Sequence, residues 1–285
     1  MNSSFLQASL LLAALAAGCT NAEVVDNFLE IPECVRSFHQ KLEPTGLSSN
    51  RTASICQRLD GLYFYATLYD VSRRIPLYSA YVLEVSNTSR PDISSSNWYL
   101  EPMLSDLNST NMEKPSSSVL REHLELITEN QAVNDDYRNS GYTRGHLNPS
   151  QHHSSKAQLA TFTYTNMAPQ ESKLNSGTWN QYETHLKVNV LPACSKTHVL
   201  MGVVPSGSQP GQGVWIKERV NVPLYFWSAY CCMHKGGGWV AEARLGLNAN
   251  PYVVKTLTVP HLEEVLSWEF GQSVIIFPNH CSSEV

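Results

Sequence analysis

The pattern of apolar and polar positions along the chain predicts more strands than helices. Two runs rich in aromatic and β-branched residues, 63–69 and 77–83, flank the polar stretch 70–76 and therefore predict a β-hairpin. The segment 86–118 is rich in Ser, Asn and Pro, which is typical of an exposed excursion. We expect further strands at 161–165, 198–204, 224–230 and 274–277.

Helical periodicity is confined to two segments. Trp179, Tyr182 and Leu186 recur at helical spacing. A second run opens with Val259 and Pro260, and its apolar residues can share one face: Leu262, Val265, Leu266 and Phe270. Because strands outnumber helices and do not alternate with them regularly, we expect an α+β fold with a mostly antiparallel sheet, not a parallel βαβ array. We expect residues 23–285 to form a single domain.

The first 22 residues have the layout of a signal peptide. They contain no charged side chain, run through the apolar stretch 10–17 and end in small or polar residues up to Ala22. The apolar run is about half the roughly 20 residues that cross a bilayer, and no later run comes close, so we expect no stable membrane insertion. A second interpretation is a bacterial lipoprotein cleavage box at 15–19, which would leave a lipidated Cys19.

Cysteines and glycosylation sequons favour an exported glycoprotein. An even number of cysteines in an exported chain suggests disulfides. We expect Cys34 to pair with Cys56, and Cys231 and Cys232, on opposite faces of a strand, to reach different partners. Three sequons begin at Asn50, Asn87 and Asn108 in turn-rich contexts. We therefore expect a secreted protein or one that resides in the lumen of the secretory pathway. The six cysteines after residue 22 are Cys34, Cys56, Cys194, Cys231, Cys232 and Cys281.

Composition changes this picture in one respect. The 285 residues carry a net charge of −5, so bulk charge does not draw the chain to nucleic acid, and a polyanionic partner needs a local basic patch. The segment from Arg138 to Lys196 supplies one, because it holds six basic residues and only two acidic ones. Charged residues make up 16% of the chain, which excludes highly charged disordered and coiled-coil classes.

This basic segment contains the parts needed for phosphodiester hydrolysis. His146 can act as a base near neutral pH, and Arg144 offers a bidentate fork for phosphate. The neutral carbonyl oxygen of Asn175 suits a hydrated Mg²⁺. In a regular helix Glu183 would lie about 12 Å from Asn175 along the axis and about 80° around it, so the two cannot share one ion without a bend between them. We therefore expect Glu183 to contact water or to orient the amide.

The motif Arg144-Gly145-His146, followed by Asn166, Asn175 and Glu183, resembles the DNA/RNA non-specific endonuclease family with its ββα-metal active site. The resemblance implies that His146 is the general base and that Asn175 is the only protein ligand of a Mg²⁺ or Mn²⁺ ion. It also implies that Arg144 and Asn166 contact the phosphate or the transition state, and that Glu183 contacts a metal-bound water. Lys187 stands where the family often has a basic residue, whereas Thr143 replaces the usual Asp before the Arg-Gly-His.

The sequence thus predicts a secreted or lumenal, metal-dependent nuclease that binds DNA and RNA through the phosphate backbone with little sequence preference. Two alternatives stay open: a catalytically weak or inactive glycoprotein that acts as a binding module, favoured by Thr143, and a phosphodiesterase for small nucleotides. His152 and His153 lie in a polar stretch and are expected to be solvated loop residues. The sequence specifies no oligomeric state.

Overall fold

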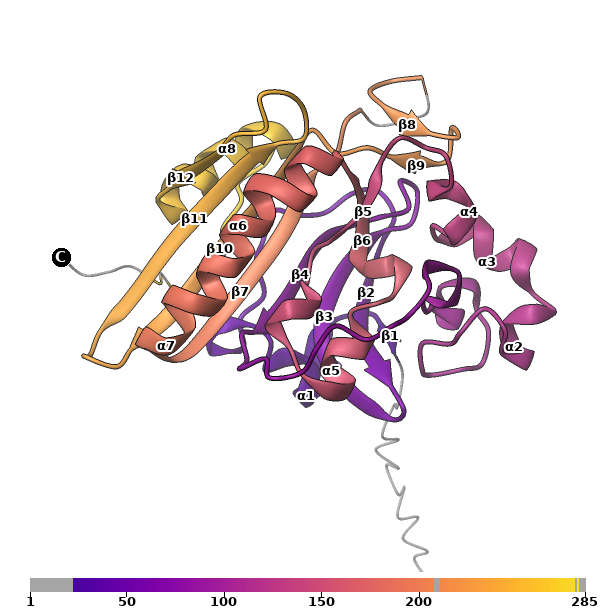
Figure 1. The fold of residues 1–285 in the computed structure, drawn as a ribbon, viewed down its shortest axis with the longest axis horizontal. Helices are drawn as coiled ribbons and strands as arrows, with labels where there is room; N and C mark the ends of the chain where they lie inside the picture. The colour runs from indigo at the N-terminus through magenta and orange to yellow at the C-terminus, as the bar shows by residue number, and fades with distance from the viewer. Residues whose placement is uncertain (1–22, 208–210, 280, 282–285) are drawn as a thin grey trace, which may run out of the picture.

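The fold is built on one eight-stranded antiparallel sheet (Figure 1). The computed structural model describes residues 23–207, 211–279 and 281, so the predicted signal peptide and the alternative lipoprotein box lie outside the described residues. Every neighbouring pair of strands in the sheet is antiparallel. In sheet order, the strands are β1 (Val24–Val25), β2 (Thr52–Leu59), β3 (Leu62–Asp70), β4 (Ile75–Val82), β7 (Cys194–Val204), β10 (Tyr225–His234), β11 (Trp239–Leu247) and β12 (Val254–Leu257).

The predicted hairpin is confirmed as β3 and β4, which pair in register through Ala66 and Ala80. The predicted strands at 198–204 and 224–230 are confirmed as parts of β7 and β10. The other two predicted strands are wrong. Residues 161–165 lead into the 3₁₀ turn η6 (Tyr164–Asn166), and in 274–277 only Ile275 forms a bridge, to Thr45. In 161–165 only Thr163 forms a bridge, to Tyr99. Both segments are largely buried, and burial alone does not require a strand partner.

The sheet is covered on both faces, because side chains of its strands alternate between two cores. In β7, Val199, Met201 and Val203 belong to one core, whereas Leu200 and Val204 belong to the other. The helical stretch around α6 packs against the first core. The N-terminal segment and α8 pack against the second (Figure 1). This three-layer arrangement is the α+β fold with a mostly antiparallel sheet that the sequence predicts.

The excursion 86–118 is not simply exposed, as the sequence suggested. Trp98, Tyr99, Leu100 and Met112 are buried in the first core. Polar residues separate these buried side chains in the sequence, and two of them, Glu101 and Ser105, are themselves buried, so composition alone hides this packing. The excursion includes η3 (Ser95–Asn97) and η4 (Pro102–Ser105), and its end leads into α2 (Ser118–Arg121), α3 (Leu124–Asn130) and α4 (Asn134–Tyr137).

Two longer helical segments match the predicted periodicity. One helical stretch runs through the wide turn η7 (Leu174–Trp179), α6 (Asn180–His185), the wide turn η8 (Leu186–Val190) and α7 (Leu191–Ala193). Its Trp179 ring packs 5.9 Å from that of Phe226 in β10. The second is α8 (Val259–Phe270), which Thr258 caps by accepting a hydrogen bond from the backbone N–H of His261, and which ends at Gly271 with φ of 67°.

The remaining elements are short. They are α1 (Pro32–Val35), α5 (Ser155–Ala160), the 3₁₀ turns η1 (Phe28–Glu30), η2 (His39–Lys41) and η5 (Ser150–His152), and the strand pairs β5 (Thr143–His146) with β6 (Met167–Gln170) and β8 (Trp215–Ile216) with β9 (Val220–Asn221). Within the described part of the chain, no helix has the length and apolar character needed to span a membrane.

The disulfides agree with the expected pattern. Cys34 pairs with Cys56, which ties α1 to β2. Cys231 and Cys232 point to opposite faces of β10 and reach different partners: Cys232 pairs with Cys194 and Cys231 pairs with Cys281. The first and third disulfides thus tie segments that cover the sheet to β2 and β10, whereas the second joins the neighbouring strands β7 and β10.

Candidate active site

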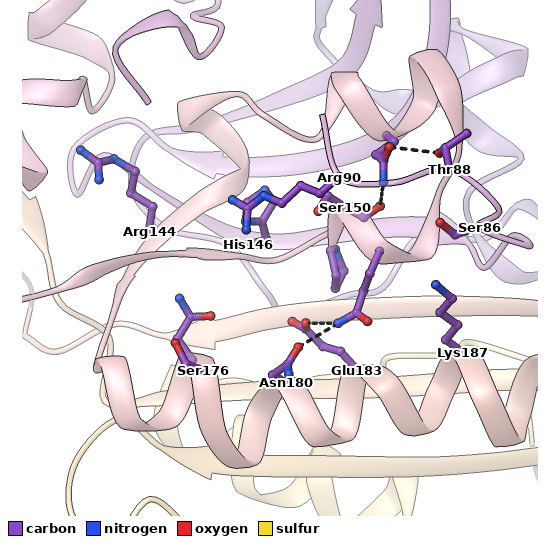
Figure 2. A pocket seen from close by; sticks show the side chains of 14 residues that line it. Ser86, Thr88, Arg90, Arg144, His146, Ser150, Ser176, Asn180, Glu183 and Lys187 are labelled. Carbon is purple, nitrogen blue, oxygen red and sulfur yellow. Dashed lines mark hydrogen bonds between the residues drawn. The ribbon is translucent and has the colours of Figure 1, made fainter. Parts of the chain in front are cut away.

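The predicted motif lies on a small strand pair that faces the helix of η7 and α6. β5 and β6 are antiparallel, with Arg144 opposite Pro169 and His146 opposite Met167. The side chains of Arg144 and His146 line a pocket of about 510 Å³ between the strand pair and the helix (Figure 2). The full lining is Ser86, Thr88, Arg90, Arg144, His146, Pro149, Ser150, Gln151, Gln158, Asn175, Ser176, Asn180, Glu183 and Lys187.

Gly145, which lies between Arg144 and His146, occupies a position with no room for a side chain. A Cβ at Gly145 would lie 2.4 Å from Oε1 and 2.8 Å from Cβ of Gln170 on the neighbouring strand. These distances are shorter than van der Waals contact, so a larger residue would push β5 away from β6. Only glycine allows this close approach, which holds Arg144 and His146 at the pocket.

His146 is a neutral imidazole at neutral pH. Its ring packs edge-on against Trp98 and Phe162, with centroids 5.5 Å and 5.2 Å away. Burial, together with the positive charge of Arg90, lowers the pKa of His146 to about 3. Among the described residues, none forms a hydrogen bond with the ring, and Nε2 is buried. No described group uses the capacity of the ring to accept a proton, and the residue lines the pocket.

Arg144 is held by neutral groups, so its positive charge stays uncompensated. Its Nη2 donates to Oδ1 of Asn134 over 2.8 Å, and the guanidinium lies over the rings of Tyr137 and Trp98, 5.1 Å and 5.7 Å from their centroids. No carboxylate of the described residues forms an ion pair with it. A bound anion can therefore complete the coordination of this side chain.

Asn175 reaches the same pocket from η7, and its amide is oriented by Thr143. The Nδ2 of Asn175 donates to Oγ1 of Thr143 over 2.8 Å, and that hydroxyl donates to the carbonyl of Gln170 over 2.7 Å. Because the amide nitrogen is engaged by the strand pair, the opposite carbonyl oxygen is the atom left for the pocket.

Glu183 also lines the pocket, so the structure brings it together with Asn175. The wide turn η7 lies between them and contains Gly177, whose backbone is not helical (φ −109°, ψ −111°). This irregularity is the bend that a regular helix would have lacked. Burial raises the pKa of Glu183 to about 8, and a hydrogen bond of 2.9 Å from Nε2 of Gln151 acts in the opposite direction.

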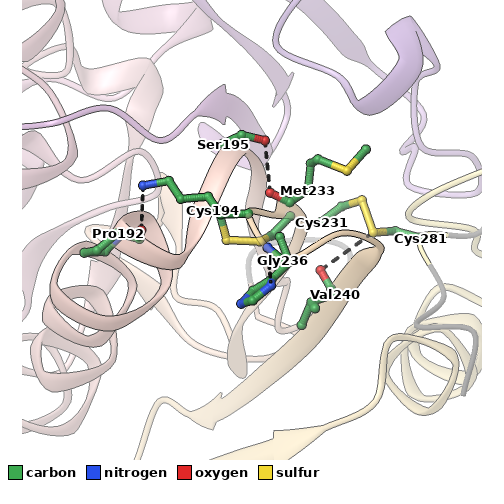
Figure 3. The surroundings of a disulfide bond; sticks show 11 residues. Pro192, Cys194, Ser195, Cys231, Met233, Gly236, Val240 and Cys281 are labelled. Atoms are coloured by element: carbon green, nitrogen blue, oxygen red, sulfur yellow. Dashed lines mark hydrogen bonds between the residues drawn. A yellow bond between two sulfur atoms is a disulfide. The ribbon is translucent and has the colours of Figure 1, made fainter.

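The end of this helical stretch is fixed covalently. Cys194 follows α7 directly as the first residue of β7, and it pairs with Cys232 near the end of the neighbouring strand β10 (Figure 3). Lys235 donates to the carbonyl of Pro192 in the same region. The segment that carries Asn175 and Glu183 is therefore anchored to the sheet at its C-terminal end.

Asn166 is not brought into the pocket. It is fully buried, and its side chain is satisfied by the protein: Nδ2 donates to the carbonyls of Asn148 and Thr161, and Oδ1 accepts from Ser79 and from the backbone of Asn148. These contacts hold the loop after His146 against β4. This position supports a structural role for Asn166, not a direct contact with phosphate.

The expectation that His152 and His153 are solvated is wrong. Both are buried, because η5 folds back against the sheet. The two ring nitrogens of His152 lie 2.8 Å from the hydroxyl of Tyr81 and 2.9 Å from the carbonyl of Glu183. Burial lowers the pKa of His152 to about 3, so its ring is neutral. The ring links the hydroxyl of Tyr81 to the backbone carbonyl of Glu183.

Arg90 is the main pocket residue that sequence reasoning missed. Its guanidinium lies 5.4 Å from the ring centroid of Phe162, and it faces the same pocket as His146 (Figure 2). It comes from the Ser-rich excursion, where a lone basic residue is a weak signal. With Arg144 and Lys187 it makes the pocket cationic, against the single carboxyl group of Glu183.

The oxygen donors of the pocket fit a hydrated hard cation. Asn175, Ser176, Asn180 and Glu183 offer amide, hydroxyl and carboxyl oxygens from one side of the pocket. No group of three or more His, Cys, Asp or Glu able to hold a metal occurs in the part of the chain that the structure describes. Such a site leaves most of an ion's shell to water and substrate, as Mg²⁺ prefers.

Comparison with known proteins agrees with the motif. The sequence profile of the DNA/RNA non-specific endonuclease family matches residues 47–273, which include the strand pair, the pocket and the helix. The chain belongs to this family. The human endonuclease domain-containing 1 protein is 31% identical over 252 residues, covering 87% of this chain and 47% of that protein. Bovine mitochondrial endonuclease G is 30% identical over 158 residues, covering 52% of each chain.

The fold likeness extends to solved structures. A crystal structure of the EndoG/EndoGI complex matches with a TM-score of 0.52 at 20% identity, covering 76% of this chain and 84% of that one. The chain spans about half the length of the curated relatives named above. Family membership therefore applies to the nuclease-like fold and its motif.

Proposed function

We propose that this chain is an exported, metal-dependent nuclease that hydrolyses phosphodiester bonds of DNA and RNA with little sequence preference. The observation that carries the proposal is the convergence of His146, Arg144, Asn175 and Glu183 on one cationic pocket. Three cationic side chains around a neutral imidazole suit a phosphate group. Contacts to phosphate carry no base information, so they recognise DNA and RNA alike.

In this proposal His146 is the general base. Its neutral ring accepts a proton from a water molecule, whose oxygen attacks phosphorus while the bond to the leaving oxygen breaks. The negative charge of a bound phosphate offsets the charge of Arg90 and raises the pKa of His146, which makes the ring a better base when substrate is present.

Arg144 and Arg90 face the charge that develops on the phosphoryl oxygens. Asn175 would hold a Mg²⁺ or Mn²⁺ ion through its carbonyl oxygen, and when bound, such an ion supplies a Lewis acid for the phosphoryl and leaving oxygens. Glu183, held by Gln151, accepts hydrogen bonds from water in the pocket. Lys187, one turn further along the helix, adds positive charge at the pocket edge.

Purified protein incubated with plasmid DNA and with RNA tests the proposal. Cleavage of both polymers is expected with Mg²⁺ or Mn²⁺, and loss of cleavage is expected on addition of EDTA or in His146→Ala. His234→Ala is the matched control, because His234 is exposed at the far end of β10, outside the pocket. Cleavage that persists in His146→Ala or in EDTA would rule out this mechanism.

The competing function is a binding module without hydrolysis, and Thr143 in place of the usual family Asp favours it. It predicts that purified protein binds a duplex oligonucleotide but cleaves neither DNA nor RNA, and that Thr143→Asp restores cleavage. Turnover of the unmodified protein on long DNA would exclude it.

We further propose that residues 1–22 direct export and that residues 23–285 act as one domain. The three disulfides support an oxidising compartment. Recovery of the protein from the culture medium of a secretory host, with Glu23 at its N-terminus, is the expected result. Retention in the cytosol with residues 1–22 in place would contradict it.

A further inference from the structure

One of the three sequons lies at the edge of the candidate active site. Asn87 is exposed and stands between Ser86 and Thr88, both of which line the pocket (Figure 2). Arg90, three residues further on, lines the same pocket beside His146 (Figure 2). The Asn87-Thr88-Ser89 sequon therefore lies within a few residues of the groups proposed to bind substrate.

The local hydrogen bonds fix the direction of this segment. The hydroxyl of Ser154 shares its single proton between the carbonyl of Val85 at 2.9 Å and Oδ1 of Asn87 at 3.1 Å, and it accepts from the backbone N–H of Asn87 over 3.3 Å. Thr88 donates to Oε1 of Gln158 in α5 over 3.1 Å. The segment is thus docked on α5, and the carbonyl oxygen of the Asn87 amide is engaged.

The other amide atom of Asn87 is the one that glycosylation uses. None of the described residues forms a hydrogen bond with Nδ2 of Asn87, and the side chain is exposed. An oligosaccharide attached to Nδ2 leaves the hydrogen bonds between Asn87 and Ser154 intact. The folded structure accommodates the modification at a fixed place beside the pocket.

The other two sequons do not share this position. Asn50 lines a separate pocket near Arg73 and Phe270. Asn108 is exposed, and Oγ1 of Thr110 in its sequon accepts a hydrogen bond from Arg58, remote from the active-site lining. Modification of these residues would leave the candidate active site open, so Asn108 supplies an internal control.

We propose that Asn87 carries an N-linked oligosaccharide that borders the active-site pocket and restricts entry of long nucleic acids more than entry of small diesters. The proposal rests on the proposed export and nuclease function. In the modification, Nδ2 of Asn87 bonds to the anomeric carbon of an oligosaccharide from a lipid-diphosphate-linked donor. The bond from that carbon to the diphosphate oxygen breaks, the amide gives up one proton, and the lipid diphosphate leaves.

The first experiment measures occupancy and does not depend on nuclease activity. The full chain is expressed in a secretory eukaryotic host, and sequon peptides are analysed by mass spectrometry after enzymatic removal of glycans in ¹⁸O-labelled water. Conversion of Asn87 to labelled Asp is expected in the chain without substitutions and in Ser89→Thr, which keeps the sequon. It is expected to vanish in Ser89→Ala, which destroys the sequon but retains Asn87. An unmodified Asn87 in the recovered protein would overturn the proposal.

The second experiment measures access. Cleavage of long duplex DNA is expected to increase several-fold in Ser89→Ala, whereas cleavage of a chromogenic small diester and the activity of Ser89→Thr and Asn108→Gln should not change. If no form cleaves DNA, the proposed nuclease function fails, and binding of a labelled duplex in EDTA replaces cleavage as the measure of access. Equal cleavage or equal binding by the occupied and unoccupied forms would overturn the restriction of polymer access.

Discussion

Asn175 and Thr143 are joined by a hydrogen bond of 2.8 Å that runs from the helix to the strand pair across the pocket. The same hydroxyl donates to the carbonyl of Gln170, so Thr143 links β5, β6 and the amide proposed to hold the ion. An uncharged hydroxyl is enough to orient this amide. The replacement of the usual acidic residue therefore removes a charge but keeps an acceptor at this point.

This relationship makes Thr143→Val and Thr143→Ser a matched pair. Valine removes the acceptor but keeps the branched shape, so the amide of Asn175 loses its orientation, and we expect the Mg²⁺ concentration for half-maximal cleavage to rise about tenfold, corresponding to about 1–1.5 kcal/mol for one hydrogen bond. Serine keeps the hydroxyl and should stay near the unmodified protein. Metal titration of initial cleavage rates measures both. An unchanged metal dependence in Thr143→Val would show that Thr143 does not orient the amide.

Arg90 is expected to contribute to nucleic-acid binding through charge. Replacing it by Gln should weaken binding of any duplex sequence. The slope of log K against log salt concentration is negative, and it should become less steep by about 0.9, the value for one phosphate contact on B-DNA. Fluorescence anisotropy with a labelled duplex in EDTA measures the slope. Lys255→Gln is the control, because Lys255 is exposed on β12 and does not line the pocket. An unchanged slope in Arg90→Gln would place Arg90 outside the binding surface.

Local sequence patterns predicted the parts of this molecule that depend on local geometry. Alternating apolar residues predicted β3, β4, β7 and β10, and helical spacing predicted the packing of Trp179. The family resemblance implied that the motif residues act together, and four of them, Arg144, His146, Asn175 and Glu183, line one pocket, whereas Asn166 does not. Helix geometry gave Asn175 and Glu183 different roles on the assumption of a regular helix, and the non-helical Gly177 in η7 is a departure from that geometry which no local pattern predicted.

The features that were missed depend on contacts between segments far apart in sequence. Arg90 reaches the pocket because the excursion folds back over Phe162, which no local pattern encodes. His152 is buried because a polar turn packs beneath Tyr81. Asn166 belongs to the motif by spacing, yet the packing of β4 against the loop after His146 encloses it. Spacing locates a residue along the chain, but burial depends on the whole fold.

Asn166 is expected to affect stability more than chemistry. Asn166→Ala would leave several buried partners of its amide unpaired, at about 1–3 kcal/mol each, so we expect the free energy of unfolding to fall by about 3 kcal/mol or more. Urea unfolding followed by tryptophan fluorescence measures it. Where the variant remains folded at low temperature, kcat should stay within a few-fold of the unmodified protein. A stable Asn166→Ala protein with kcat reduced a hundredfold would instead support a direct role for Asn166 in the reaction.

The buried carboxyl groups of Glu23 and Glu101 predict how stability depends on pH. Oε1 of Glu101 accepts hydrogen bonds from Thr163 and Thr165. Burial raises the pKa of both groups, and the negative charge of Glu101 raises that of Glu23 further, so the folded pair retains a proton above the ordinary carboxyl range. The folded pair therefore binds more protons than the same two groups in the unfolded chain, so the contribution of this pair to the free energy of unfolding should decrease as pH rises above about 4.

Glu101→Gln should make that decrease smaller, because the neutral amide removes one buried acid and the repulsion on Glu23, while its oxygen still accepts from the two threonines. The exposed Glu264→Gln is the matched control and should follow the pH profile of the unmodified protein. Urea unfolding measured at intervals from about pH 4 to pH 9 compares the three proteins, over the range in which a carboxyl with a raised pKa loses its proton. The slope of the free energy of unfolding against pH changes only when the folded and unfolded states bind different numbers of protons. Parallel profiles for Glu101→Gln and the protein without substitutions would therefore mean that the pair ionises in the folded state as it does in the unfolded chain.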